Sequence, residues 1–507
     1  MKALNVGLLS SIGMLVVGGI VFAVTPAGGF SATAENKTAS TRDEVDNNDV
    51  AGAGDSTVQA SGDLGSTFSV DGTLKLEGRL GHSSLKATNP DETFVLLEVS
   101  GTDKGKGEAP PVALSLVIDR SGSMRGTRHQ NALLAAAGAV ERLHDGDTVS
   151  VVAFDTRTET IVPSTTINAS SRQNILQSIR GIQLGGDTCI SCGIEGGLIE
   201  LAKSSSPSGE IVKRMVVMSD GDTNNGIRDI PGFKSLAQRA MSQGINITTI
   251  GVDLDFNEKI MSAIAQSSNG RHYFVESDRD LARVFEAEAS LLTDSVANEA
   301  VADIELGQGV EVVRVFDRTF TRSGSRISIP LGSIAKGEVK TVLVKVRLPK
   351  GDAGQLPIAS AKLAYRDLVA NKDATSSGQL ALELVDGQAS AFDSIVLDRV
   401  QRSETGSALR EANSLFSVGK ADEARKRLET QQRAVNAARP SAAKSAPADR
   451  AKGVDDSLAK QEAELNRAID NFAQPPPTQP GASPAAPAPA QKSQVKRSAA
   501  EADNFSR

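Results

Sequence analysis

Two kinds of hydrophobic pattern alternate along this chain of 507 residues and divide it into regions. Residues Val112 to Ile118 form a nearly continuous apolar run, which is typical of a parallel strand buried on both faces. Directly after it, Leu133, Ala137, Val140 and Leu143 recur at steps of three and four residues. That spacing places them on one side of a helix, so the pattern predicts a strand followed by a helix.

The same alternation of strand and helix continues as far as residue 292. Strands alternating with helices imply right-handed crossovers and a parallel sheet that is covered on both faces. We therefore predict a doubly wound, mostly parallel α/β domain over residues 109–294. Its further strands are predicted at 148–154, 215–218, 245–252 and 273–275, and its further helices at 173–180, 190–202, 258–266 and 280–292.

A different pattern, with a period of two residues, flanks this domain on both sides. Val342 and Val344 fall on one face of a predicted strand, whereas Lys345 falls on the other face. Residues 67–108 and 295–386 both show this texture and are predicted to be all-β. Pairing them gives one β-sandwich into which the α/β domain is inserted.

The N-terminal region is predicted to direct export. Lys2 is followed by an uncharged run, Ala3 to Val24, whose span of roughly 20 residues is long enough to cross a hydrocarbon core. Residues 1–26 are therefore predicted to be a signal peptide or an uncleaved signal anchor. Residues 27–66 are rich in Ser, Thr, Gly, Asn and Asp, and we expect a disordered stalk there. The protein is expected in the periplasm, in the cell envelope or outside the cell, and it would meet the membrane only through this segment.

Beyond residue 390 the hydrophobic period becomes helical again. Leu409 and Ala412 mark one helix, a turn follows at Gly419, and Leu428 lies on a second helix. This pair resembles half of a tetratricopeptide array and cannot bury its apolar face alone, so we favour docking on the sandwich over docking on a partner. The predicted segments are a helical hairpin (387–437), a linker (438–455), a short helix (456–472) and a disordered Pro/Ala-rich tail (473–507).

Composition narrows the range of partners. The chain carries 55 basic and 62 acidic residues, so it offers no broad cationic surface for nucleic acid. It has no Trp and two Tyr, which removes most of the usual stacking platforms for bases and sugars. We therefore expect no nucleic-acid partner.

Oxygen-bearing side chains follow the predicted strands of the α/β domain. Asp119, Ser121 and Ser123 end the first strand, Thr188 opens a helix, and Asp220 ends a later strand. The carboxyl ends of parallel strands meet at one edge of the sheet, where ligands bind. A few hard oxygen ligands, mostly hydroxyls, suit Mg²⁺ or Mn²⁺, with Ca²⁺ as the alternative. An ion with an exchangeable position would accept an Asp or Glu carboxylate from a protein partner.

The run Val117 to Met124 resembles the metal-ion-dependent adhesion site (MIDAS) of von Willebrand factor type A (vWA) domains, and Thr188 and Asp220 match its second and third loops. Two further runs, Asp147 to Phe154 and Leu254 to Glu258, strengthen the match. The chain looks like the bacterial branch labelled calcium-activated chloride channel-like, which is related to inter-alpha-trypsin inhibitor heavy chains.

This resemblance implies a Rossmann-like fold and a protein-binding or adhesion function. It also implies that Ser121, Ser123 and Thr188 touch the metal, whereas Asp119 and Asp220 act largely through water. The chain departs from the family pattern at two acidic positions, Asp187 and Asp253. These extra carboxylates leave the affinity for an acidic partner open.

Cys189 and Cys192 are the chain's two cysteines and stand beside the predicted metal loop. Two thiols cannot complete a tetrahedral zinc site. In an oxidising compartment they could form a structural disulfide, which we favour over a pair of buried thiols and over a redox-active pair.

Catalysis is not expected from this sequence. Ser121 occupies the place of the second, acid-base aspartate of haloacid dehalogenase-like phosphatases, and no nucleophile is paired with a His. The expectation is a non-enzymatic, metal-ion-dependent protein-binding or adhesion module. The alternative is an assembly scaffold of the envelope that uses the fold without capturing a ligand at the metal. An ion channel or a hydrolase is not supported.

Overall fold

The computed structural model describes residues 56–59, 64–88, 90, 92–103, 111–204, 211–220, 223–252, 257–275, 283–284, 287–288, 291, 294–473 and 489–506. Outside these residues lie four predicted features: the export segment, most of the stalk, Asp253 and most of the helix 280–292. Among the helices that it describes, none is long and apolar enough to span a membrane.

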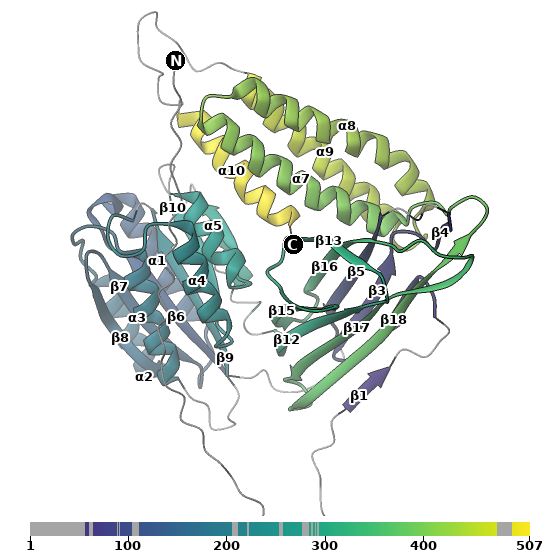
Figure 1. Ribbon diagram of the computed structural model, residues 1–507. Coiled ribbons are helices and arrows are strands. Elements are labelled where there is room, and N and C mark those ends of the chain that lie inside the picture. Colours follow the sequence, from purple (N-terminus) through teal and green to yellow (C-terminus); the bar gives the residue numbers. More distant parts are fainter. Residues whose placement is uncertain are drawn as a thin grey trace, which may run out of the picture. The chain divides into compact units, whose positions relative to one another are not determined.

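The predicted α/β domain is confirmed (Figure 1). Its central strand β6 is buried at every position, as its continuous apolar run predicts. Five of the six strands are parallel, and the chain passes to opposite sides of β6 for β7 and β9, which makes the carboxyl end of β6 a switch point. The sheet order is β11 (His272–Val275), β10 (Asn246–Val252), β9 (Val212–Ser219), β6 (Val112–Asp119), β7 (Thr148–Phe154) and β8 (Thr158–Thr166).

Helices cover both faces of this sheet, and each face has its own apolar cluster. One cluster joins the sheet to α1 (Thr127–Arg142) and α2 (Ala169–Arg180). The other joins it to α3 (Ile190–Lys203), α4 (Ile230–Met241) and α5 (Glu258–Ser267). Helix α4 and the antiparallel edge strand β8 were not predicted from the sequence.

The predicted β-sandwich is also confirmed, and both chain segments that flank the α/β domain build it. Strand β16 from the second segment pairs with β5 from the first over nine residues. The side chains between the two sheets form one apolar cluster. One sheet contains β13 (Glu311–Phe316), β16 (Val339–Arg347), β5 (Glu92–Gly101), β3 (Leu74–Leu80) and β2 (Thr67–Val70). The other contains β1 (Ser56–Gln59), β18 (Lys372–Val385), β17 (Gly354–Asp367), β12 (Ser295–Leu306), β15 (Arg326–Ala335) and β14 (Thr321–Ser323), with β4 (Ser84–Lys86) also beside β18.

Strand β1 corrects the prediction of a stalk over residues 27–66. It pairs in parallel with β18 at the edge of the larger sheet, from Ser56 opposite Ala374 to Gln59 opposite Ser377. Backbone hydrogen bonding to an open sheet edge orders this polar segment, although its composition predicts disorder.

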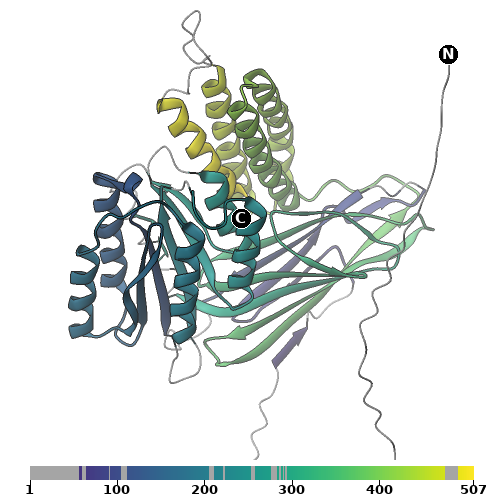
Figure 2. The same ribbon diagram turned by 60° about the vertical axis from the view of Figure 1, so that its left-hand side comes forward.

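The C-terminal region differs most from the prediction. The predicted helical hairpin is present, and the predicted short helix is longer than expected. The predicted linker and a large part of the predicted disordered tail are also helical, so four long helices lie side by side in the described residues (Figures 1 and 2). They pack on one face of the smaller sheet, where Leu96 and Leu343 join their apolar cluster. The helices are α7 (Ser394–Ser417), α8 (Ala421–Ser445), α9 (Ala451–Ala473) and α10 (Pro489–Phe505).

Tertiary packing explains both corrections at this end. Helix α8 continues through Pro440 into the predicted linker, and the neighbouring Ala442 is fully buried in the cluster. Helix α10 forms within the predicted disordered tail because Phe505 is buried and Arg399 donates hydrogen bonds to the carbonyls of Phe505 and Ser506. These contacts satisfy backbone groups at the end of α10. The docking of these helices on the sandwich agrees with the favoured interpretation.

Candidate functional site

All five predicted metal ligands lie at the carboxyl edge of the parallel sheet. Asp119 is the last residue of β6, and the short 3₁₀ helix Gly122–Met124 follows it. Asp220 comes directly after β9, and Thr188 lies two residues before the first residue of α3. The doubly wound topology therefore brings three separate loops to one place, as the strand-end positions of these residues predict.

Asp119 anchors the first loop from a fully buried position. One carboxylate oxygen accepts a hydrogen bond from the Ser121 amide at 2.8 Å, and the other accepts one from the Ser219 hydroxyl at 2.5 Å. Burial, aided by repulsion from Asp220, raises the pKa of Asp119 to about 6 against the hydrogen bonds that lower it. Ionising Asp119 therefore reduces stability as the pH rises from about 4 to about 6, and a bound cation would offset this loss.

The oxygens of Ser121, Ser123 and Asp220 form a contiguous row. The two serine hydroxyls lie 2.9 Å apart, and Ser123 Oγ donates to Asp220 Oδ1 at 3.0 Å. Adjacent ligands of an octahedral Mg²⁺ at about 2.1 Å from the ion lie about 3.0 Å from one another. The spacing therefore fits neighbouring ligand positions of such an ion. Ser121 and Asp220 are buried, whereas Ser123 is exposed, so solvent reaches this row at Ser123.

Backbone hydrogen bonds place Thr188 next to this row. The Gly122 amide donates to the Gly186 carbonyl at 2.9 Å, and the Gly185 amide donates to the Arg120 carbonyl at 2.7 Å. Thr188 itself is buried. No hydrogen bond joins its hydroxyl to the other four predicted ligands within the part of the chain that the structure describes. The loop contacts, and not a direct side-chain bond, bring Thr188 to the site.

Asn224 and Asp155 support the Thr188 loop, although neither was predicted from the sequence to belong to the site. Asn224 Oδ1 accepts from the Thr188 amide at 2.9 Å. Asp155 follows β7 at the same sheet edge. Burial raises the pKa of its carboxyl group, but hydrogen bonds from backbone amides outweigh this effect, so that the pKa is lowered overall. A Cβ on Gly185 would lie 1.7 Å from an Asp155 carboxylate oxygen, so Gly185 permits this close packing. The position of Asp155 directly after a buried strand was the available signal.

A basic residue, Arg128 of α1, also belongs to the site. Its Nη1 donates to the Ser123 carbonyl at 3.0 Å and lies 3.3 Å from Asp220 Oδ2. A fixed positive charge here partly neutralises Asp220 and opposes a cation. It also favours an incoming carboxylate.

Arg128→Gln is expected to tighten Mg²⁺ binding by roughly threefold to tenfold, since a partly exposed ion pair is worth about 1 kcal/mol. Calorimetric titration of the full chain would measure this change. Arg125→Gln is the matched control because Arg125 is exposed in the same loop. Weaker binding in Arg128→Gln would show that the arginine organises the loop more than it repels the ion.

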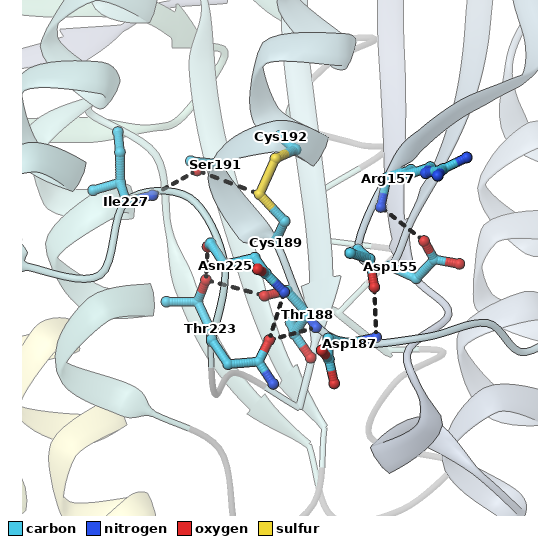
Figure 3. The surroundings of a disulfide bond; sticks show 12 residues. Asp155, Arg157, Asp187, Thr188, Cys189, Ser191, Cys192, Thr223, Asn225 and Ile227 are labelled. Carbon is cyan, nitrogen blue, oxygen red and sulfur yellow. Dashed lines mark hydrogen bonds between the residues drawn. A yellow bond between two sulfur atoms is a disulfide. The ribbon is translucent and has the colours of Figure 1, made fainter.

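Cys189 and Cys192 form a disulfide at the start of α3, as the favoured interpretation of the sequence anticipated (Figure 3). The Ser191 hydroxyl lies 3.7 Å from Cys189 Sγ and accepts a hydrogen bond from the Ile227 amide at 3.0 Å. Gly226, with a φ of +70°, leaves room for this cluster, because a Cβ there would lie 2.3 Å from the Ser191 hydroxyl. The disulfide therefore lies between the Thr188 loop and the loop that follows β9.

Removing the disulfide by Cys189→Ala/Cys192→Ala is expected to lower the free energy of unfolding by about 2 kcal/mol, the chain-entropy value for so short a loop. Urea unfolding would measure it. Reduction of the wild-type chain should give the same loss and leave the double variant unchanged. A reductant effect of equal size on the variant would show that another group is responsible.

Two acidic residues, Asp187 and Asp253, depart from the family pattern in the sequence. Asp187 is exposed at the rim of the site, and its amide donates to the Thr156 hydroxyl at 2.9 Å. Asp253 lies outside the described residues. Among the described residues, no group of three or more His, Cys, Asp or Glu side chains could hold a metal. A cation at the predicted site would therefore depend on serine and threonine hydroxyls beside the two carboxylates.

Comparison with known proteins identifies the α/β domain. Residues 114–287 match the family model of the von Willebrand factor type A domain. The chain contains a VWA domain. The match covers the sheet edge that carries all five predicted ligands, so the sequence resemblance to this family is confirmed.

The chain spans only part of the length of each curated relative that it resembles. An uncharacterised protein of Synechocystis sp. is 24% identical over 284 residues, which cover 54% of this chain and 66% of that protein. The uncharacterised protein YfbK of Escherichia coli is 25% identical over 43% of this chain and 37% of its own length. Inter-alpha-trypsin inhibitor heavy chain H1 of Mesocricetus auratus is 26% identical over 38% of this chain and 21% of its own length. Since less than two thirds of each relative is matched, the activities of these whole proteins do not carry over.

Two solved structures resemble a larger part of the fold. The von Willebrand factor type A protein of Catenulispora acidiphila has a TM-score of 0.62 at 15% identity, covering 86% of this chain and 97% of that one. The ArnB paralog VWA2 of Sulfolobus acidocaldarius has a TM-score of 0.54 at 19% identity, covering 86% and 100%. At these identities the likeness shows the fold alone. None of the relatives named here places the chain in the calcium-activated chloride channel-like branch, which stays a prediction.

Proposed function

We propose that the VWA domain is a metal-ion-dependent protein-binding module. VWA domains are commonly protein-interaction or adhesion modules. In this chain Ser121, Ser123, Thr188, Asp119 and Asp220 would hold Mg²⁺, with Mn²⁺ or Ca²⁺ as substitutes. The bound ion supplies an electron-poor position that accepts an Asp or Glu carboxylate of the partner. The protein is not an enzyme in this proposal.

One observation carries the proposal. Ser121, Ser123 and Asp220 present oxygens at 2.9 and 3.0 Å spacing, and this row is buried except at Ser123. Such an arrangement binds an ion on its protein side and leaves a coordination position open to a ligand on its solvent side. Arg128 beside Ser123 adds a positive charge that suits an acidic ligand.

We further propose that the protein is exported and acts in the periplasm, in the envelope or outside the cell. The uncharged run from Ala3 to Val24 supports this location. The disulfide between Cys189 and Cys192 supports it too, because disulfides persist in oxidising compartments. Anchoring to a membrane would depend on the N-terminal segment.

Two linked measurements test the function. Calorimetric titration of the full chain with MgCl₂ should give one ion per chain. In a second measurement Mn²⁺ replaces Mg²⁺, and water molecules that exchange at the bound ion should speed the relaxation of water protons. An acetylated Gly-Glu-Gly peptide should displace this water and reverse the effect. The matched Gly-Gln-Gly peptide should not. Absence of ion binding would leave the VWA fold as an assembly scaffold. Ion binding without displacement by the glutamate peptide would refute capture of a carboxylate.

A further inference from the structure

A second polar site lies away from the metal-site edge, near the amino ends of β9 and β11. A cavity of about 70 Å³ opens there between the VWA domain, the sandwich and α10. Its volume exceeds the ~15 Å³ that one water molecule needs. Four basic residues line it: Arg214 from β9, Arg271 just before β11, Arg318 from the loop after β13, and Lys340 from β16.

Two of these basic residues are neutralised by carboxylates. Arg214 Nη1 donates to Glu288 Oε2 at 3.1 Å, and Arg271 Nη2 donates to Glu338 Oε1 at 3.0 Å. Glu288 also accepts from the Thr248 hydroxyl at 2.8 Å. Each of these two arginines therefore has a carboxylate as its ion-pair partner.

The remaining acidic residues of the lining are also occupied. Asp317 lies 3.4 Å from Arg399 and 3.3 Å from Arg410. Asp503 of α10 accepts from Ser262 at 2.7 Å and from Gln266 at 2.6 Å, and it lies 3.7 Å from Arg410. Two carboxylates are thus balanced by two arginines.

Lys340 and Arg318 form no ion pair with a carboxylate among the described residues, although Glu338 acts on Lys340 and Asp317 acts on Arg318 from a greater distance. Lys340 is 7% exposed, and its ammonium donates to the carbonyls of Leu331 and Ser333 at 2.8 and 2.7 Å. Arg318 Nε donates to the Thr341 carbonyl at 3.0 Å. Neither side chain lies within 4.0 Å of an acidic group in the described residues. Lys340 is buried and Arg318 is partly buried. A desolvated positive charge without an ion-pair partner is unfavourable, so two of them beside one cavity need an explanation.

Two further facts point to a negative ligand. Arg214 is 6% exposed, and its Nε has no hydrogen-bond partner within the described residues. Burial lowers the pKa of Lys340 to about 8 in spite of Glu338, and the charges of Arg318, Arg214 and Arg271 act in the same direction. An anion in the cavity would accept from these donors and relieve the repulsion between them.

We propose that this cavity binds a small tetrahedral oxyanion of the phosphate or sulfate class, held by Lys340, Arg318 and Arg214. Guanidinium and ammonium groups that converge on a small buried volume are the usual ligands of such anions. Because the cavity is lined by the VWA domain, the sandwich and α10, the anion would join all three. The site is separate from the metal site, since Arg214 lies near one end of β9 and Asp220 follows the other end.

Calorimetric titration of the full chain with sodium phosphate, and separately with sodium sulfate, tests the proposal. EDTA in the buffer keeps cations from the VWA metal site, and sodium chloride at equal ionic strength is the ionic control. One oxyanion per chain is expected. Lys340→Met and Arg318→Met should each weaken binding by tenfold or more, whereas Lys362→Met, an exposed change in the same sandwich, should leave it unaltered.

Circular dichroism would verify that each variant folds, and if Lys340→Met does not, Arg318→Met decides. The proposal is overturned if the wild-type chain takes up neither oxyanion, because the cavity would then hold water alone. It is equally overturned if a folded Lys340→Met or Arg318→Met chain binds phosphate as tightly as the wild type. Chloride binding as tightly as phosphate would also overturn it, since the site would then show no preference for an oxyanion.

Discussion

Replacing Ser121 and Ser123 together with alanine is expected to weaken Mg²⁺ binding on the order of 100-fold. Both hydroxyls belong to the row whose spacing fits an octahedral ion, and Ser121 also lies 2.9 Å from Ser123. Their loss leaves the Thr188 hydroxyl and two carboxylates, and one of these carboxylates already accepts hydrogen bonds from the Ser219 hydroxyl and the Ser121 amide. Calorimetric titration of the full chain with MgCl₂ would measure the change. Ser170→Ala, on the exposed surface of α2, is the matched control.

Asp119→Asn provides a second, independent readout of the same site. It should also lose Mg²⁺ binding, yet without metal it should unfold at a higher temperature than the wild type. The rise in the pKa of Asp119 from 3.8 to about 6 corresponds to about 3 kcal/mol at neutral pH, which is the upper limit of this gain. Undiminished Mg²⁺ affinity in both variants would remove these loops from the metal site. A less stable Asp119→Asn chain would show that the carboxylate is needed for its hydrogen bonds.

The α/β domain and its site could be predicted because both depend on local pattern. The strand β6 reads as a continuous apolar run, and Asp119 and Asp220 stand at strand ends, where topology alone brings them together. The supporting residues were harder to find. Arg128 and Asn224 contact the site through side-chain hydrogen bonds. The spacing of residues along the chain does not predict such contacts.

The elements that were missed lack the expected pattern. Strand β8 is largely polar and exposed, because it forms the outer edge of its sheet and has one face in water. Helix α4 contains Pro231, and a proline in a sequence usually indicates the end of a helix. In the structure Pro231 lies in the first turn, after the capping residue Asp229, where its missing amide costs nothing. Helix α10 depends on burial of Ala502 and Phe505 among other helices, so composition alone predicts disorder there.

Gly193→Val is expected to lower the free energy of unfolding by about 3 kcal/mol. Gly193 lies in α3 against β6 and β7, and a Cβ there would be 2.5 Å from the Phe154 ring and 2.9 Å from Val117. Both of these neighbours are fully buried, so neither can turn aside, and α3 must move away from the sheet. Urea unfolding would measure the loss. Gly138→Ala in α1 is the control, since its Cβ would meet only the flexible Arg142 side chain.

The same substitution should weaken Mg²⁺ binding by roughly tenfold or more, because Thr188 stands just before α3 and moves with it. The Cys189 amide, bonded to the Asp155 carbonyl at 2.9 Å, transmits that movement to the loop after β7. Adding Phe154→Ala to Gly193→Val makes room for the valine and should restore much of the affinity, although it costs stability of its own. If Gly193→Val loses stability but keeps wild-type Mg²⁺ affinity, the position of α3 does not control Thr188. The ion would then be held by the loops after β6 and β9 alone.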